Sequence, residues 1–300
     1  MYRKIVYLLK SFLIIILTCN ACNGSKSTAE QEASSNIVFS DAEKKMLEDM
    51  NQVMVDLPPP TIVPNVLMKI GSEYDPTFTN SLDNIESYQT NEDKSALNLG
   101  IYATDVGYQI AYGQAQESLN YMTALQKLAE TIGVSAIFDV SNLKSYESNL
   151  NNPDSLAALL NTTVMLAEQR LGSTDRLSMA ALILSGSFIE GLYLIIKVSE
   201  SYHVDGITED EKNLRLQPLM KIILDQEKVL VDVITLIEDI ESDEIIAKML
   251  NELQVLKIIY DVNKEDVNKI LAKDKNAVIV PQLLRDITKE IVRIREDITS

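Results

Sequence analysis

The feature of this sequence that most constrains its fold is a helical apolar period that runs from Glu92 almost to the end. Apolar side chains recur three and four positions apart, which places them on one face of an α-helix. The longest alternating stretch, at residues 278–280, is too short to indicate a strand. The sequence therefore predicts an all-α fold. Helices are expected at residues 92–112, 114–132, 154–171, 174–201, 209–241, 243–262 and 281–298.

Residues that start and stop helices support these limits. Gly133 and Gly172 follow periodic segments, and glycine commonly ends a helix. Side-chain oxygens at residues 152–154, 173–175 and 208–211 can cap the free amides of the helices that follow. The last of these segments has the pattern of a capping box.

Shorter helices are expected before this region. Residues 40–43 can form a capping box for a helix that ends near Val55. Pro64 can start a short helix that Gly71 stops. Residues 75–90 are expected to form a mixed loop with a short helix.

The last three expected helices carry apolar seams with an average spacing of about 3.5 residues, which suits antiparallel packing. We therefore predict a single multi-helix bundle or array with a C-terminal antiparallel three-helix segment. The seams should form an intramolecular core, and a dimerising seam is the alternative. Pro218 should kink or restart the first of these helices. The seams are Leu219, Ile223, Gln226, Leu230, Val233, Ile237 and Ile240; Ile246, Met249, Leu253, Leu256 and Tyr260; and Leu284, Ile287, Ile291, Ile294 and Ile298.

A stripe of small residues runs down one face of the helix expected at 92–112. Each glycine inside a helix costs roughly 1 kcal/mol, so close approach of a second helix should compensate. The nearly all-apolar helix expected at 174–201 carries Ser187 and Gly191 on one face, and it is the expected partner and centre of the domain. The stripe consists of Ala96, Gly100, Ala103, Gly107 and Ala111.

Each of these two helices carries a carboxylate that does not fit its apolar surroundings. Asp105 and Glu190 are each followed three residues later by a tyrosine on the same face, Tyr108 and Tyr193. A lone carboxylate in an apolar core is costly unless it is paired or hydrogen-bonded. Three interpretations follow. The carboxylates accept bonds from tyrosine hydroxyls or helix-end amides, or they reach solvent, or all four residues line a polar pocket for a cation or a small polar ligand.

The N-terminal residues are typical of a secretory signal. Basic residues precede a short apolar run at 11–17, and small residues follow it. The run is too short to span a bilayer, which takes ~20 apolar residues. The only two cysteines of the chain, Cys19 and Cys22, lie where the signal ends. This pattern resembles a bacterial lipoprotein signal, in which the cysteine after the cleavage point receives lipid.

We take Cys22 as the lipidated residue and Cys19 as the alternative. Cys22 follows Ala21, which suits cleavage, but Cys19 lies where such signals have leucine. Cys19 has Ile16 in that place, but Thr18 is a poor residue before the cut. An ordinary secretory signal is a further possibility. With at most one free thiol left, the mature protein cannot close an internal disulfide.

The formal charge of −17 opposes binding to nucleic acid, because a strongly acidic surface repels a phosphate backbone. It also opposes binding to anionic lipid headgroups, so membrane attachment should come from the lipid anchor.

Searches for catalytic and metal-binding patterns fail. His203 is the only histidine, so neither a zinc site of the usual His/Cys type nor a Ser-His-Asp triad can be built on it alone. The sequence contains neither GxxxxGK[ST] nor GxGxxG. We therefore expect no metal and no cofactor, and we favour a protein that is not an enzyme.

Five segments resemble an uncharacterised family of Gram-negative secreted lipoproteins: 97–108 (LNLGIYATDVGY), 116–121 (QESLNY), 127–129 (KLA), 180–183 (AALI) and 189–193 (IEGLY). The likeness covers roughly residues 40–300. It implies an all-helical, lipid-anchored protein without an assigned activity, and it adds no catalytic residue. The segments around the two central carboxylates would be the family's signature region.

The sequence as a whole predicts three parts: a lipoprotein signal at 1–21, a flexible polar tether at 22–37 and an all-α domain at 38–300. The expected location is the bacterial cell envelope, anchored to the outer membrane on its periplasmic or surface face. The expected function is a non-enzymatic binding or interaction module with an envelope protein as partner. The alternative is a small-ligand or cation-binding protein, or less favourably a hydrolase, built on the two central carboxylates.

Overall fold

A computed structural model describes residues 41–56, 66–68, 71–138, 140–172, 176–203, 205–206, 208–240, 243–273 and 281–300. Contacts divide the chain after Val38, and every described residue lies in the second unit, Phe39–Ser300. The predicted signal, its cysteines and the tether lie outside the described residues.

The all-α prediction is confirmed, since all regular elements in the described part are helices and none is a strand. The α-helices are α1 (Asp41–Asp56), α3 (Ile85–Tyr88), α4 (Glu92–Ala111), α5 (Ala115–Thr131), α6 (Val140–Ser148), α7 (Pro153–Gly172), α8 (Leu177–Ser201), α9 (Glu209–Glu238), α10 (Glu244–Lys273) and α11 (Pro281–Ile298). Short 3₁₀ turns are η2 (Pro76–Phe78), η3 (Leu82–Asn84) and η4 (Ser135–Phe138).

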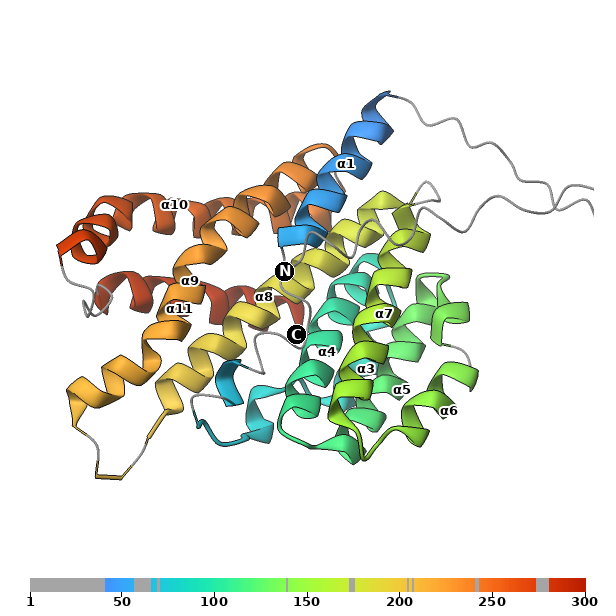
Figure 1. Cartoon of the computed structure of the whole chain (residues 1–300). Coiled ribbons are helices and arrows are strands. Elements are labelled where there is room, and N and C mark those ends of the chain that lie inside the picture. Colours follow the sequence, from blue (N-terminus) through green and yellow to red (C-terminus); the bar gives the residue numbers. More distant parts are fainter. Residues whose placement is uncertain are drawn as a thin grey trace, which may run out of the picture. The chain divides into compact units, whose positions relative to one another are not determined.

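Helix α8 forms the centre of the domain, as its composition predicts. It packs against α4 and α7 on one side and against α9 and α11 on the other (Figure 1). It is long and apolar enough to cross a membrane, but 94% of its most apolar window is buried inside the domain. That degree of burial is typical of a core helix, which has no apolar face left for lipid.

Helices α4 and α8 touch backbone to backbone. A Cβ atom on Gly100 would lie 2.1 Å from the carbonyl oxygen of Ile183, and one on Gly186 would lie 2.0 Å from that of Leu97. The predicted close approach is therefore present, but Gly186 rather than Gly191 provides the second glycine. A Cβ on Gly191 would meet nothing within 4 Å.

The three C-terminal helices bury the predicted seams. Helix α10 packs against both α9 and α11, and α11 also packs against α8 (Figure 1). Two seam positions differ from the prediction: Leu284 is half-buried while its neighbour Leu283 is 1% exposed, and Ile240 is half-buried. Helix α9 continues through Pro218 without restarting, and its predicted capping box forms.

The sequence missed two short elements and misplaced the end of one helix. Helix α6 and turn η4 lie between expected helices, where no apolar period is visible. Helix α10 extends to Lys273, eleven residues past its expected end at 262. By contrast, Gly133 follows α5 with a φ value of 70°, as expected for a glycine stop, and Gly71, after the helical residues 66–68, has a φ value of 83°.

Candidate functional site: a buried carboxylate pair and its arginine

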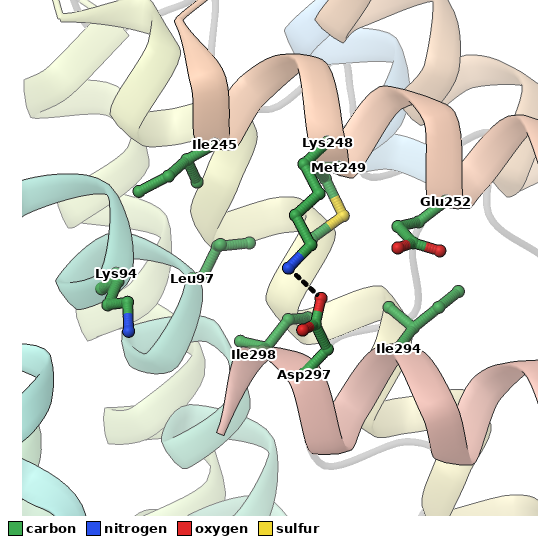
Figure 2. A pocket seen from close by; sticks show the side chains of 9 residues that line it. All are labelled: Lys94, Leu97, Ile245, Lys248, Met249, Glu252, Ile294, Asp297 and Ile298. Carbon is green, nitrogen blue, oxygen red and sulfur yellow. Dashed lines mark ion pairs between the residues drawn. The ribbon is translucent and has the colours of Figure 1, made fainter. Parts of the chain in front are cut away.

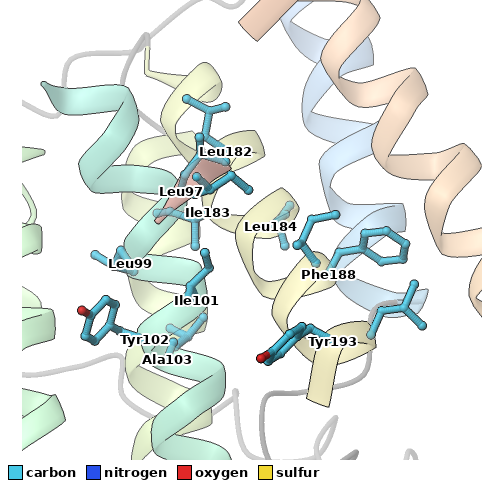
Figure 3. Close-up of a cluster of buried hydrophobic side chains, with 14 of the residues drawn as sticks. Leu97, Leu99, Ile101, Tyr102, Ala103, Leu182, Ile183, Leu184, Phe188 and Tyr193 are labelled. Carbon is cyan, nitrogen blue, oxygen red and sulfur yellow. The ribbon is translucent and has the colours of Figure 1, made fainter. Parts of the chain in front are cut away.

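The two carboxylates that the sequence singles out lie together in the core. Helices α4 and α8 run in the same direction (Figure 3) and touch at Gly100 and Gly186. Asp105 and Glu190 follow these glycines by a similar distance along their helices, so they come to lie side by side. Both residues are 0% exposed, and the two carboxyl groups lie within hydrogen-bonding reach of each other. The interpretation that they reach solvent is therefore wrong.

An arginine from α11 forms an ion pair with one of the two carboxylates, that of Glu190. The Nε of Arg295 donates to one oxygen of Glu190 at 2.6 Å, and its Nη2 donates to the other at 3.1 Å. The guanidinium also lies 4.1 Å from the centre of the Tyr193 ring and donates to the carbonyl oxygen of Phe78 at 3.3 Å. Arg295, Glu190 and Tyr193 thus form a charge-assisted contact between α11 and α8, which we call the clasp.

Asp105 holds a proton more tightly than an isolated carboxyl group would. Burial and the neighbouring charge of Glu190 raise the pKa of Asp105 well above its usual range. Arg295 and a hydrogen bond from the backbone N–H of Asn80 oppose this rise. Burial alone would lower the pKa of Arg295, but the charge and hydrogen bonds of Glu190 raise it overall. With Asp105 protonated, the positive charge of Arg295 balances the negative charge of Glu190, so the cluster is electrically neutral, as a buried group of this kind requires.

The same groups hold a backbone segment, residues 72–81, which we call the strap. Asp105 accepts a hydrogen bond from the N–H of Asn80 at 2.9 Å, and Tyr121 donates to the carbonyl oxygen of Asn80 at 2.6 Å. Tyr108 accepts from the N–H of Asp75 at 3.0 Å. Burial raises the pKa of Tyr121 to about 12, so its hydroxyl stays a donor. The network therefore satisfies strap backbone groups that burial would otherwise leave unpaired.

The structure thus separates the four predicted site residues. Asp105 and Glu190 meet, and Tyr193 supports their counter-ion. The hydroxyl of Tyr108 is used by the strap. Arg295, which completes the cluster, was not predicted, because on a surface-type helix its charge resembles a solvated one. The signal for Arg295 was the presence of two carboxylates in apolar stretches without a basic residue beside them, because such groups need a cation from elsewhere in the chain.

Some polar atoms in this region have no partner. Oδ1 of Asp105 is buried without a hydrogen-bond partner, and both amide atoms of Gln109, one turn further along α4, are also buried and unpaired. Within the described residues, no group of three His, Cys, Asp or Glu side chains is placed to hold a metal ion. The position that a cation would take beside Glu190 is filled by the guanidinium of Arg295.

A pocket of about 70 Å³ lies elsewhere, where the start of α4, the start of α10 and the end of α11 meet (Figure 2). Its floor is apolar and its rim is charged. This pocket was not predicted, since its walls come from segments far apart in the chain. The lining residues are Lys94, Leu97, Ile245, Lys248, Met249, Glu252, Ile294, Asp297 and Ile298.

No family model, curated protein or solved structure matches this chain. The resemblance to secreted lipoproteins therefore stays a prediction from the segments around the two carboxylates.

Proposed function

We propose that this chain is a lipid-anchored cell-envelope protein whose helical domain is a non-enzymatic binding or interaction module. The observation that carries the non-enzymatic part is the two-pronged bond between Glu190 and Arg295. A catalytic carboxylate must reach the substrate proton that it moves. Both oxygens of Glu190 are instead engaged by an internal cation, and the strap covers Asp105.

The anchoring part of the proposal rests on the sequence alone. The basic start, short apolar run and small residues before Cys22 support a lipoprotein signal, with Cys19 as the alternative lipid acceptor. The membrane is then reached through the lipid, and an envelope protein is the proposed partner. The acidic charge of −17 disfavours nucleic acid.

A small polar ligand in the core is the second candidate, and one observation favours it. The unpaired amide of Gln109 and the unpaired Oδ1 of Asp105, one turn apart on α4, are donors and acceptors that a small polar molecule could satisfy. A cation is disfavoured, because Arg295 already provides the positive charge.

Native mass spectrometry of the protein purified from its own cell envelope distinguishes these candidates. The interaction-module proposal expects no co-purifying small molecule and expects an envelope protein in the cross-linked complex. It also expects Gln109→Met to keep or raise the melting temperature, because an unpaired buried amide is replaced by an apolar group of similar size. A bound molecule that is lost in Gln109→Met, but kept in the exposed control Glu147→Gln, would move the function to the core site.

A further inference from the structure

The pocket between α4, α10 and α11 has a floor that is already formed. Leu97, Met249, Ile294 and Ile298 are between 1% and 8% exposed, so three helices fix them. Leu97 is held further because its backbone contacts Gly186 of α8. An apolar ligand group entering this pocket would meet packed side chains rather than a surface that must rearrange.

The acidic groups on the rim are already neutralised. Asp297 forms an ion pair with Lys248 at 2.5 Å, which runs from α11 to α10 beside the pocket (Figure 2). Glu252 accepts hydrogen bonds from both terminal nitrogens of Arg293. Neither carboxylate is therefore available to attract a cationic ligand without breaking an existing pair.

Lys94 differs from the other charged residues of the rim. It lies in the first turn of α4 and lines the pocket, yet its ammonium group has no ion-pair or hydrogen-bond partner among the described residues. Among the described residues that line the pocket, the charge left over is therefore a single positive one. An apolar group with one negative charge complements this arrangement, because its carboxylate can bind Lys94 while its hydrocarbon part covers the floor.

The size of the pocket limits the hydrocarbon part. Its volume of about 70 Å³ is small, since a cavity that holds benzene measures ~150 Å³. A branched group of roughly three carbons fits inside, about half of what the benzene cavity holds, with a methylene and the charged end at the rim.

From this geometry we infer that the pocket is a binding site for a small branched-chain carboxylate, held by Lys94 above the floor formed by α4, α10 and α11. The site lies apart from the central carboxylates, and the inference holds whether or not the chain is lipid-anchored.

Methyl NMR of the full-length protein titrated with 3-methylbutanoate tests this inference. Saturable shifts are expected for the methyl groups of Ile245, Met249 and Ile294, with a dissociation constant in the millimolar range that suits a ligand of few heavy atoms. The neutral amide of the same acid should bind about tenfold more weakly, because it lacks the charge that pairs with Lys94. The cationic amine 3-methylbutylamine should bind most weakly of the three.

Two lysine variants assign the charge. Lys94→Met keeps the aliphatic stem and should weaken binding of the acid about tenfold, while Lys94→Arg should retain it. Lys127→Met removes an exposed positive charge on α5 and is the matched control, which should leave the affinity unchanged. Ile245→Phe should abolish binding by filling the pocket, and its melting temperature reports whether it still folds.

Three results would overturn the inference. The first is the absence of saturable shifts up to about 50 mM acid, where any remaining affinity is negligible. The second is tighter binding of the amine than of the acid. The third is an unchanged affinity in Lys94→Met, which does not depend on whether Ile245→Phe folds.

Discussion

Breaking the buried ion pair should distinguish the roles of the two central carboxylates. Glu190→Gln leaves the guanidinium of Arg295, which is only 11% exposed, without its ionised partner. Removing one member of a buried pair costs about 3–5 kcal/mol of unfolding free energy. A domain of this size loses ~2–4 °C of melting temperature per kcal/mol, so Glu190→Gln should melt about 6–20 °C lower.

Asp105→Asn should cost far less, about 1 kcal/mol or below, because an amide reproduces the protonated acid. Its oxygen can still accept from the N–H of Asn80, and its N–H can donate to Glu190. Urea unfolding followed by far-ultraviolet circular dichroism at pH 7 measures both variants, with the exposed Glu147→Gln as control. Equal losses for Asp105→Asn and Glu190→Gln would show that Asp105 is not held protonated beside the Glu190–Arg295 ion pair.

The pH dependence gives a second check on the same reasoning. Because the pKa of Asp105 is raised in the folded state, the folded protein binds more protons than the unfolded one. The stability from this group is complete below the unfolded pKa and is lost as pH rises through the folded pKa. The Asp105→Asn variant lacks this titration, so its free energy of unfolding should rise with pH relative to that of the original protein. Parallel stability curves for the two proteins would refute the shifted titration.

Three further predictions concern other parts of the chain. Gly100→Ala should lower the free energy of unfolding by about 1–3 kcal/mol, because its Cβ would lie 2.1 Å from a carbonyl oxygen. Gly191→Ala should raise it by about 0.5–1 kcal/mol. Equal melting temperatures for the two variants would contradict the helix contact. Burial raises the pKa of Asp93 to about 6, so its contribution to stability should be lost as pH rises through about 6. The melting temperature of Asp93→Asn should therefore depend less on pH near 6 than that of the original protein. Cys22→Ser should abolish labelling by a fatty-acid analogue while Cys19→Ser should not, and the reverse result would move the lipid to Cys19.

The helices could be predicted because their apolar spacing is a local property. The period from Glu92 onward indicates each long helix, and the composition of residues 177–201 marks the central one. Helix α6 was missed because its nine residues are mostly polar, and Tyr146 is the only buried one among residues 143–148, whose side chains the structure describes. A helix anchored by so few side chains has no visible period, and its position depends on tertiary contacts.

The candidate site could be predicted only in part. Asp105 and Glu190 stood out because a carboxylate in an apolar stretch needs a partner, but the sequence does not say where that partner lies. Arg295 comes 105 residues after Glu190 and stands among other charged residues. Its position one residue after the seam residue Ile294 suits either solvent or core, and only the packing of α11 on α8 decides between them.

The clasp between α11 and α8 has a consequence for how the domain opens. A helix at the edge of a domain usually detaches on its own at little cost, and its amide hydrogens then exchange quickly. If α11 detached alone, Glu190 would remain in the core without Arg295, and the strap would lose the bond to Phe78. Local opening of α11 therefore costs about 3–5 kcal/mol more than the opening of a helix without such a pair. The amide hydrogens of α11 should exchange faster in Glu190→Gln than in the original protein, because the variant lacks this cost.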